Sequence, residues 1–308
     1  MFGSFKMHPT VNIAVRAARA AGDIILRYHN QVDLLTIENK SENDFVSEVD
    51  KTAESAIIKE IKKAFPQHSI LGEESGTMIG DSDYQWIIDP LDGTTNYLHG
   101  FPQYAVSIAL VEKGITSHAV IYDPFKEELF TASKGEGAYL NNERIRVTST
   151  NGLKDTLIGT GFPFKHPQHL DCYIETFRAI HPHVSGIRRA GAAALDLAYL
   201  AAGRLDGFWE IGLNSWDMAA GALMVKEAGG FIGDFSGRDQ YMETGNVVAG
   251  NSDVYKQILK KILNQPTFIS VSILRMVFSA SAFDRFSLSS VSSRSSKVCS
   301  NLDLTMDK

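Results

Sequence analysis

The sequence has few cysteines, no excess of positive charge and no long apolar run. Its two cysteines, Cys172 and Cys299, lie far apart in unrelated contexts, so we expect neither a disulfide framework nor a zinc site, and a reducing cytoplasm suits the chain. The net charge of −6 gives no support for nucleic-acid binding, which typically needs a basic surface. The apolar stretch at residues 268–283 is interrupted by Arg275 and by serines, so we predict no transmembrane helix and no membrane partner.

Signatures of several enzyme and targeting classes are also missing. The chain has no Gly-Xaa-Ser-Xaa-Gly motif and no Walker-type phosphate loop, which argues against a serine hydrolase and a nucleotide kinase. Its first residues show no charged segment followed by an apolar one, so we predict no secretory signal, and Met7 is an alternative start to Met1. The nine histidines show no metal-ligand spacing.

Length and periodicity predict one domain followed by a tail. A chain of 308 residues, 44% of them hydrophobic, can bury a large core. We place a single domain at residues 1–265, with two lobes at about 1–150 and 151–265. Residues 266–308 are rich in serine and show little periodicity, so we predict a disordered tail and assign it no function.

Helical and strand patterns alternate along this domain. Apolar residues recur at helical spacing in residues 9–28 and 52–65, which predicts two helices packed antiparallel. Alternating apolar residues in segment 104–146 predict a meander of strands. In the second half, shorter strands alternate with helices, one of which opens near Asp217 and stops at Gly229. This order predicts an α/β fold in which helices and sheets form layers.

The most informative segment is residues 86–96. The apolar residues 86–88 predict a buried strand that ends before Pro90. Asp89 and Asp92 then emerge together at the strand exit, where two carboxylates raise each other's pKa unless a hard divalent cation lies between them. The Gly-Thr-Thr-Asn sequence that follows offers backbone N–H groups at a predicted helix N-terminus, which suits a phosphate. An ordinary turn with an N-capping acid is the simpler alternative.

Other acids could complete such a site. Glu73 and Glu74 lie in a glycine-flanked loop, where a solvated pair of acids is the usual explanation. Asp217 opens a helix of small residues and could simply cap it. Together with Asp89 and Asp92, however, Glu73 and Asp217 would make a cluster of four carboxylates able to hold two or more Mg²⁺ ions.

Three ordered blocks of the sequence resemble the signature blocks of a known family. They lie at residues 72–75, 89–96 and 216–230, and their order and spacing are similar to those of the inositol monophosphatase family. The likeness extends from about residue 7 to residue 263, and segments 161–164 and 207–210 resemble its bacterial, SuhB-type branch. It implies a five-layer αβαβα sandwich of the inositol monophosphatase and fructose-1,6-bisphosphatase type.

The resemblance also implies a set of metal ligands. Glu73, Asp89 and the backbone carbonyl of Leu91 would hold one Mg²⁺ ion. Asp89, Asp92 and Asp217 would hold a second, and the family binds two or three ions per site. Such ions neutralise a phosphate ester, create a nucleophile at neutral pH and stabilise the leaving alkoxide. They would also reverse the acidic field that otherwise repels a phosphate.

Catalytic and substrate contacts follow from the same resemblance. Thr94, with Glu73 nearby, would orient a water that displaces the alcohol in line without a covalent intermediate. The backbone N–H groups of Gly93 and Thr94 would hold the phosphate, with Asp92 and Asp217 beside it.

The remaining implied residues lie in three other segments. Glu210 would accept hydrogen bonds from ring hydroxyls, and Ala193 would contact the alcohol through its backbone. Asp50 lies where the family has an acid near the metal site, although it could equally cap a helix that starts at Thr52.

Three functions therefore compete. We favour Mg²⁺-dependent hydrolysis of inositol 1-phosphate, a small phosphorylated polyol. The same chemistry could act on fructose 1,6-bisphosphate, a nucleotide 3′-phosphate or NADP, which relatives with the same acids hydrolyse. The third function is non-enzymatic, because SuhB-type proteins are associated with ribosomal RNA transcription through Nus factors and RNA polymerase. The resemblance further implies lithium sensitivity and a homodimer.

Overall fold

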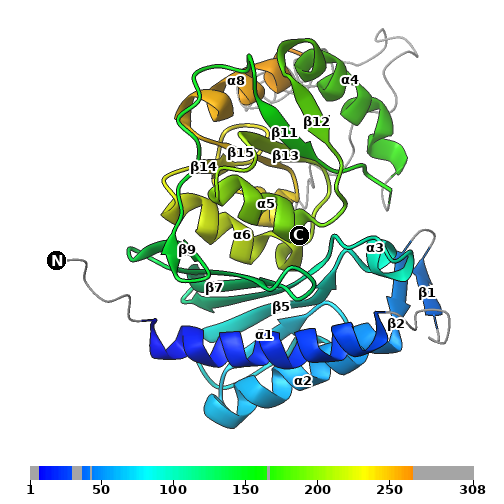
Figure 1. Cartoon of the computed structure of the whole chain (residues 1–308), viewed down its shortest axis with the longest axis vertical. Helices are drawn as coiled ribbons and strands as arrows, with labels where there is room; N and C mark the ends of the chain where they lie inside the picture. Colours follow the sequence, from blue (N-terminus) through cyan, green and yellow to red (C-terminus); the bar gives the residue numbers. More distant parts are fainter. Residues whose placement is uncertain (1–6, 30–36, 42–43, 165–166, 266–308) are drawn as a thin grey trace, which may run out of the picture.

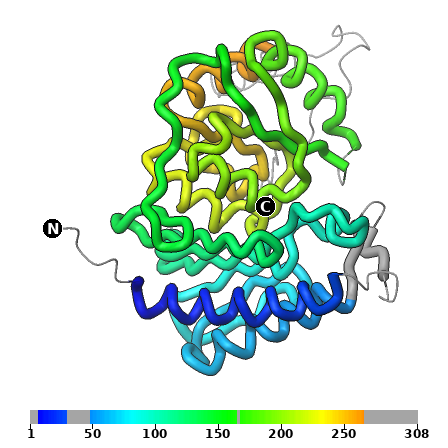
Figure 2. Tube along the Cα trace, in the orientation of Figure 1, coloured from blue at the N-terminus to red at the C-terminus, as the bar shows by residue number. Residues whose placement is uncertain are grey.

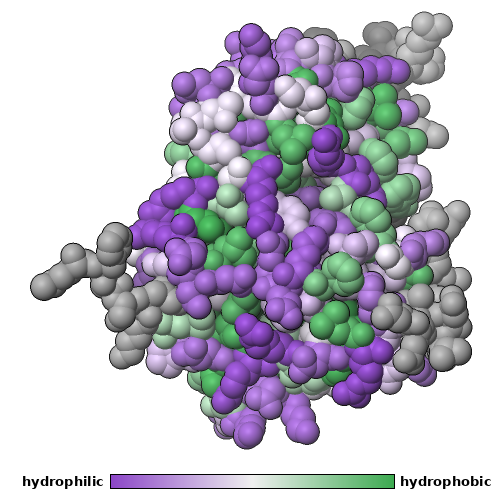
Figure 3. Space-filling model, in the orientation of Figure 1, coloured by the Kyte–Doolittle hydropathy of each residue, from purple (hydrophilic) through white to green (hydrophobic). Residues whose placement is uncertain are grey.

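The computed structural model describes residues 7–29, 37–41, 44–164 and 167–265. Its layers are stacked along the long axis of the molecule (Figure 1). The chain builds the lower layers, drawn from blue to green, before the upper ones, drawn from green to orange (Figure 2). Polar residues cover much of the face in Figure 3, with apolar residues in separate patches among them.

The lowest layer consists of two long helices, α1 (Pro9–Tyr28) and α2 (Glu48–Ala64), which pack against each other (Figure 1). Helix α1 buries a stripe of small and branched side chains at helical spacing, from Val11 to Ile25. Pro9 opens it, at a position where no backbone N–H is needed, and the His8 side chain accepts a hydrogen bond from Thr10 N at 3.2 Å. The predicted helix 9–28 is thus confirmed.

An eight-stranded sheet covers these helices. Across the sheet the strands are β10 (Glu143–Arg144), β9 (Gly137–Leu140), β8 (Glu128–Ser133), β7 (Ile115–Asp123), β6 (Ala105–Glu112), β5 (Tyr84–Asp92), β3 (Ser69–Gly72) and β4 (Gly76–Met78). Strands β5 to β10 pair antiparallel in chain order, which confirms the predicted meander. Strand β3 runs parallel to β5, so the loops after these two strands lie at the same edge of the sheet. A separate ribbon pairs β1 (Ile37–Ser41) with β2 (Asp44–Ser47).

Two helices of small residues form the middle layer. Helices α5 (Ala193–Ala201) and α6 (Ser215–Glu227) pack against each other and contact both sheets. They approach closely at Gly221, where an added Cβ would lie 2.5 Å from Leu197 Cβ. This close approach sets the separation of the two helices near their midpoints.

The upper sheet and the outer helices complete the fold. The sheet order is β12 (Gly186–Arg188), β11 (Leu157–Thr160), β13 (Gly207–Glu210), β15 (Val247–Gly250) and β14 (Phe231–Gly233). Helices α4 (Leu170–Ile180) and α8 (Ser252–Leu263) cover its far face and bury Cys172. The short elements are α3 (Thr94–Leu98), α7 (Tyr241–Thr244), η2 (Pro167–His169) and η3 (His181–His183). The predicted layered αβαβα fold is confirmed.

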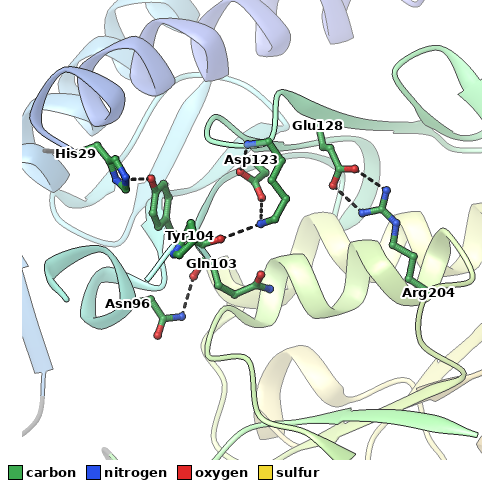
Figure 4. A network of polar contacts seen from close by, with 9 residues as sticks. His29, Asn96, Gln103, Tyr104, Asp123, Glu128 and Arg204 are labelled. Atoms are coloured by element: carbon green, nitrogen blue, oxygen red, sulfur yellow. Dashed lines mark hydrogen bonds and ion pairs between the residues drawn. The ribbon is translucent and has the colours of Figure 1, made fainter. Parts of the chain in front are cut away.

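Polar contacts tie the first sheet to the segments around it (Figure 4). Tyr104 Oη lies 2.8 Å from His29 Nδ1, just after α1. Lys126, in the β7–β8 turn, donates to the Pro102 carbonyl at 2.9 Å. Arg204, just beyond α5, forms a two-pronged ion pair with Glu128 of β8. The last contact joins the middle layer directly to the sheet.

Two predicted boundaries are wrong. Strand β5 continues through Pro90 to Asp92, because its pairing with β6 shifts between Asp89 and Asp92, and a proline is tolerated at such an irregularity. Helix α2 begins at Glu48 rather than at Thr52. Asp50 therefore lies inside its first turn and is not the cap of a helix that starts two residues later.

Residues 266–308, for which we predict a disordered tail, lie outside the described residues. Within the described residues, no helix is long and apolar enough to cross a membrane. Residues 7–265 already contain the three buried apolar clusters that join the layers. We therefore expect a chain that ends at Gln265 to keep its melting temperature within a few degrees, as measured by thermal unfolding. Loss of solubility, or a melting temperature many degrees lower, would show that the removed segment packs against the domain.

Candidate active site

A cavity of about 380 Å³ opens where the lower sheet, the middle helices and the upper sheet meet. All the predicted site residues except Asp50 line it. They are Glu73, Asp89, Leu91, Asp92, Gly93, Thr94, Ala193, Glu210 and Asp217. These residues come from five separate stretches of the chain, so their convergence is a property of the fold.

The irregular end of β5 places the first carboxylates. Asp89 is 1% exposed, and its Oδ1 accepts a hydrogen bond from Leu91 N at 3.0 Å. Asp92 reaches across to the start of α5, where its Oδ2 accepts from Ala194 N at 2.7 Å. Each backbone N–H thus fixes the direction of one aspartate side chain.

Gly93 makes the turn from β5 into α3. Its φ of 91° is left-handed, a conformation that favours glycine, and an added Cβ would lie 2.8 Å from the Gln103 carbonyl oxygen. The turn and the first residues of α3 line the cavity next to Asp92. Such a turn can hold a phosphate oxygen.

Burial and mutual repulsion dominate the electrostatics of these acids. Burial raises the pKa of Asp89 well above its usual range, and the neighbouring carboxylates of Glu73, Asp92 and Asp217 raise it further. The pKa of Asp92 is likewise raised well above normal, first by burial and then by Asp217. Carboxylates that oppose each other's ionisation in this way attract a cation.

Asp50 contacts the cavity only indirectly, through Thr94. It is 1% exposed on α2, and its Oδ1 accepts a hydrogen bond from Thr94 Oγ1 at 2.9 Å. The same hydroxyl lies 3.0 Å from the Leu91 carbonyl oxygen. Asp50 therefore orients Thr94 and does not itself line the cavity.

Two further acids lie at the ends of other elements. Glu73 occupies the loop between β3 and β4, and its backbone N–H donates to Ile88 O at 3.1 Å. Asp217 lies in the first turn of α6 and accepts a hydrogen bond from Asn214 N at 2.7 Å, as part of a capping box. The capping interpretation of Asp217 is thus correct, and the same residue also lines the cavity.

The far wall of the cavity comes from the second half of the chain. Glu210 ends β13, and burial raises its pKa well above normal, as do Asp196 and Asp217. Gly161 lies against Glu210, and an added Cβ there would collide with the carboxylate. Ala193 begins α5 beside it. This wall can accept hydrogen bonds from an alcohol.

The lining residues that the sequence-based site prediction leaves out include Asp196, Arg189 and Asn96. Asp196 is buried in α5, where burial raises its pKa to about 8. Arg189 stacks on Phe162 and Phe164, with its Cζ 5.3 and 4.8 Å from the ring centroids. Asn96 Nδ2 bridges the Gln103 and Ala190 carbonyl oxygens at 2.8 and 2.9 Å; Figure 4 shows the Gln103 contact. Two sequence signals were available: Asp196 is an acid within an apolar helix, and Asn96 ends the signature block at residues 89–96.

The oxygen-rich lining of the cavity suits a metal ion. In the part of the chain that the structure describes, no three His, Cys, Asp or Glu side chains form a ready ligand set. The chemistry nonetheless suits a hard divalent cation, because the acids Glu73, Asp89, Asp92 and Asp217 line one cavity together with Leu91. In Asp89 and in Asp92, one carboxylate oxygen accepts a hydrogen bond from a backbone N–H. Both oxygens of a carboxylate carry lone pairs, so each side chain keeps acceptor capacity for a metal ion. A cation would also relieve the repulsion between them.

Comparison with known proteins assigns the family. Residues 6–267 match the model of the inositol monophosphatase family. The chain belongs to this family. It is 52% identical over 261 residues to the Nus factor SuhB of Pseudomonas aeruginosa, covering 83% of this chain and 96% of that protein. The Nus factor SuhB of Escherichia coli (strain K12) is also 52% identical, over 84% of this chain and 97% of its own length.

Solved structures agree with this assignment. The extragenic suppressor protein suhB from Bartonella henselae superposes with a TM-score of 0.82 at 46% identity, covering 83% of this chain and 99% of that structure. The inositol monophosphatase from Anabaena (Nostoc) sp. PCC 7120 gives a TM-score of 0.71 at 37% identity, over 83% of this chain and 95% of the other. The predicted membership of the family and of its SuhB-type branch is confirmed.

Proposed function

We propose that the chain hydrolyses inositol 1-phosphate to inositol and phosphate in an Mg²⁺-dependent reaction. The observation that supports this most is the convergence of Glu73, Asp89, Asp92 and Asp217 on one cavity, next to the Gly93 turn. Acids that raise each other's pKa attract divalent cations, and the adjacent N–H groups suit the phosphoryl oxygens.

Different residues of the cavity would bind the phosphate, orient the attacking water and hold the metal ions. The backbone N–H groups of Gly93 and Thr94 bind the phosphate, and the Thr94 hydroxyl, held by Asp50, orients the attacking water together with Glu73. Two or three Mg²⁺ ions, held by Glu73, Asp89, Leu91 O, Asp92 and Asp217, supply charge neutralisation and a more acidic water when bound.

The outer part of the cavity would bind the alcohol. Glu210 and the start of α5 at Ala193 face the same space and can contact ring hydroxyls. Phosphate release from inositol 1-phosphate should therefore be faster than from fructose 1,6-bisphosphate, a nucleotide 3′-phosphate or NADP at equal concentration. If one of these three compounds is hydrolysed faster, the proposed metal chemistry stands but inositol 1-phosphate is not the preferred substrate.

Lithium should inhibit the reaction. Li⁺ is a small cation with a preference for oxygen ligands, and the family resemblance implies that it binds among these carboxylates after the alcohol has left. We expect inhibition that is uncompetitive with inositol 1-phosphate, measured as parallel double-reciprocal plots at increasing LiCl. Full activity at tens of millimolar LiCl, with KCl as the ionic-strength control, would contradict this part of the mechanism.

The names of the relatives support a second role. Several proteins about half identical to this chain are Nus factors, so we propose that it also associates with RNA polymerase and Nus factors. We further propose that the protein is a homodimer and that it acts in the cytoplasm. Size-exclusion chromatography with light scattering tests the dimer. An Asp89→Asn chain that still captures RNA polymerase would separate this role from catalysis, and failure of the wild-type chain to capture it would contradict the role.

A further inference from the structure

Helix α2 carries two buried acids one turn apart, of which only the first was predicted to act in the site. Asp50 and Glu54 are 1% and 3% exposed and lie on the face of α2 that packs against the sheet. Carboxylates are costly to bury unless partners hold them. Asp50 accepts a hydrogen bond from the Thr94 hydroxyl. The partner of Glu54 lies in a different segment.

Glu54 holds the hairpin loop that contains Glu73. Its Oε1 accepts a hydrogen bond from Glu74 N at 3.0 Å. The loop is short, since β3 ends at Gly72 and β4 begins at Gly76, and these two residues pair directly. Hydrogen bonds that a carboxylate accepts are among the stronger single contacts in a protein. This one ties the loop to a helix residue that comes 20 positions earlier in the chain.

Gly72 makes room for this contact. Its φ is not in the left-handed region, so backbone conformation does not explain the glycine. Instead, an added Cβ would collide with the Glu54 carboxylate and would lie 2.7 Å from Ser75 Oγ. The absence of a side chain at Gly72 thus allows the Glu54 carboxylate to reach the loop.

Glu73 is therefore held on both sides through consecutive backbone groups. Its own N–H donates to Ile88 O of β5 at 3.1 Å, and the next N–H donates to Glu54 of α2. From this geometry we infer that Glu54 is a positioning residue, which sets the direction of the Glu73 carboxylate and so the affinity of the site for Mg²⁺. The inference rests on the proposed function, in which Glu73 is a ligand.

The test is an MgCl₂ titration of the melting temperature of the full, metal-free chain, which needs no substrate. Partners that orient a metal ligand typically contribute 10–100-fold to affinity. Glu54→Ala should raise by roughly 10-fold or more the Mg²⁺ concentration at which the melting temperature begins to rise, because binding shifts melting by mass action once the ligand exceeds its Kd. Glu54→Gln should lose much less, since its amide oxygen can still accept from Glu74 N. The exposed neighbour Ser55→Ala is the matched control and should titrate like the wild type.

A second variant covers the case in which Glu54→Ala fails to fold. Gly72→Ala leaves Glu54 in place but pushes its carboxylate away from the loop, so it should weaken Mg²⁺ binding in the same direction. A lower melting temperature without metal, combined with an unchanged Mg²⁺ titration in both variants, would show a merely structural role and overturn the inference. A wild-type chain that Mg²⁺ does not stabilise would overturn the proposed function as well, so the two failures are distinguishable.

Discussion

Replacement of Asp89 by asparagine should lower kcat for phosphate release by about a thousandfold or more. Asp89 is buried at the point where β5 meets the cavity, and it is the one carboxylate proposed to contact two Mg²⁺ ions. A metal ion stabilises the transition state by several kcal/mol, and about 4 kcal/mol corresponds to a thousandfold in rate. Steady-state assays at saturating Mg²⁺ and substrate measure this loss.

The same substitution should not unfold the protein. The asparagine side-chain oxygen can still accept from Leu91 N. Burial and neighbouring acids raise the pKa of Asp89 above its unfolded value, so its ionised form costs stability at neutral pH when no metal is bound. The metal-free variant should therefore melt at an equal or higher temperature than the wild type. The exposed Asp81→Asn is the control and should leave both quantities unchanged, whereas wild-type turnover in Asp89→Asn would refute the assignment.

Enlargement of Gly221 should produce the largest change in stability. Glycine to alanine inside a helix normally stabilises it by about 1 kcal/mol. Here the added Cβ would lie 2.5 Å from Leu197 Cβ between two buried helices, and overpacking of this kind costs about 1–3 kcal/mol. We expect Gly221→Ala to be destabilising in spite of its higher helix propensity, and Gly221→Leu to be more so.

Chemical denaturation of the three chains measures this series. The effect should reach the site as well, because α5 presents Ala194 N to Asp92 and α6 carries Asp217. A gain in stability for Gly221→Ala would show that the two helices can move apart at no cost, and would remove Gly221 as the residue that sets their separation.

Regular patterns in the sequence were enough to predict a layered α/β fold, whereas the five-layer αβαβα order came only from the family resemblance. Helix α1 has the predicted bounds because small and branched residues recur along one face and a proline opens it. The meander from β6 to β9 is equally regular, with apolar residues on alternate positions. Where each local preference agrees with the final packing, sequence reasoning succeeds.

The failures lie where tertiary contacts override a local rule. Proline normally ends a strand, but β5 passes through Pro90 because β6 tolerates an irregularity there, and this irregularity directs Asp89 and Asp92 into the cavity. For Asp50 the residues alone left a helix cap as an alternative to the site role that the resemblance implies, because the hydrogen bond from Thr94 comes from 44 residues later in the chain. Asp196 and Arg189 lie outside the three signature blocks of the sequence, and only the folded chain brings them to the cavity wall.

The roles of the predicted ligands stay predictions, although the structure brings them to one cavity. The most direct test is an Mg²⁺ titration of phosphate release from inositol 1-phosphate by the EDTA-treated wild-type chain, with Asp89→Asn measured in parallel. We predict no release without Mg²⁺, a saturable recovery when it is added back to the wild type, and no recovery for Asp89→Asn. Release that persists in EDTA, or recovery of Asp89→Asn to the wild-type rate, would contradict a metal-dependent phosphatase built on these carboxylates.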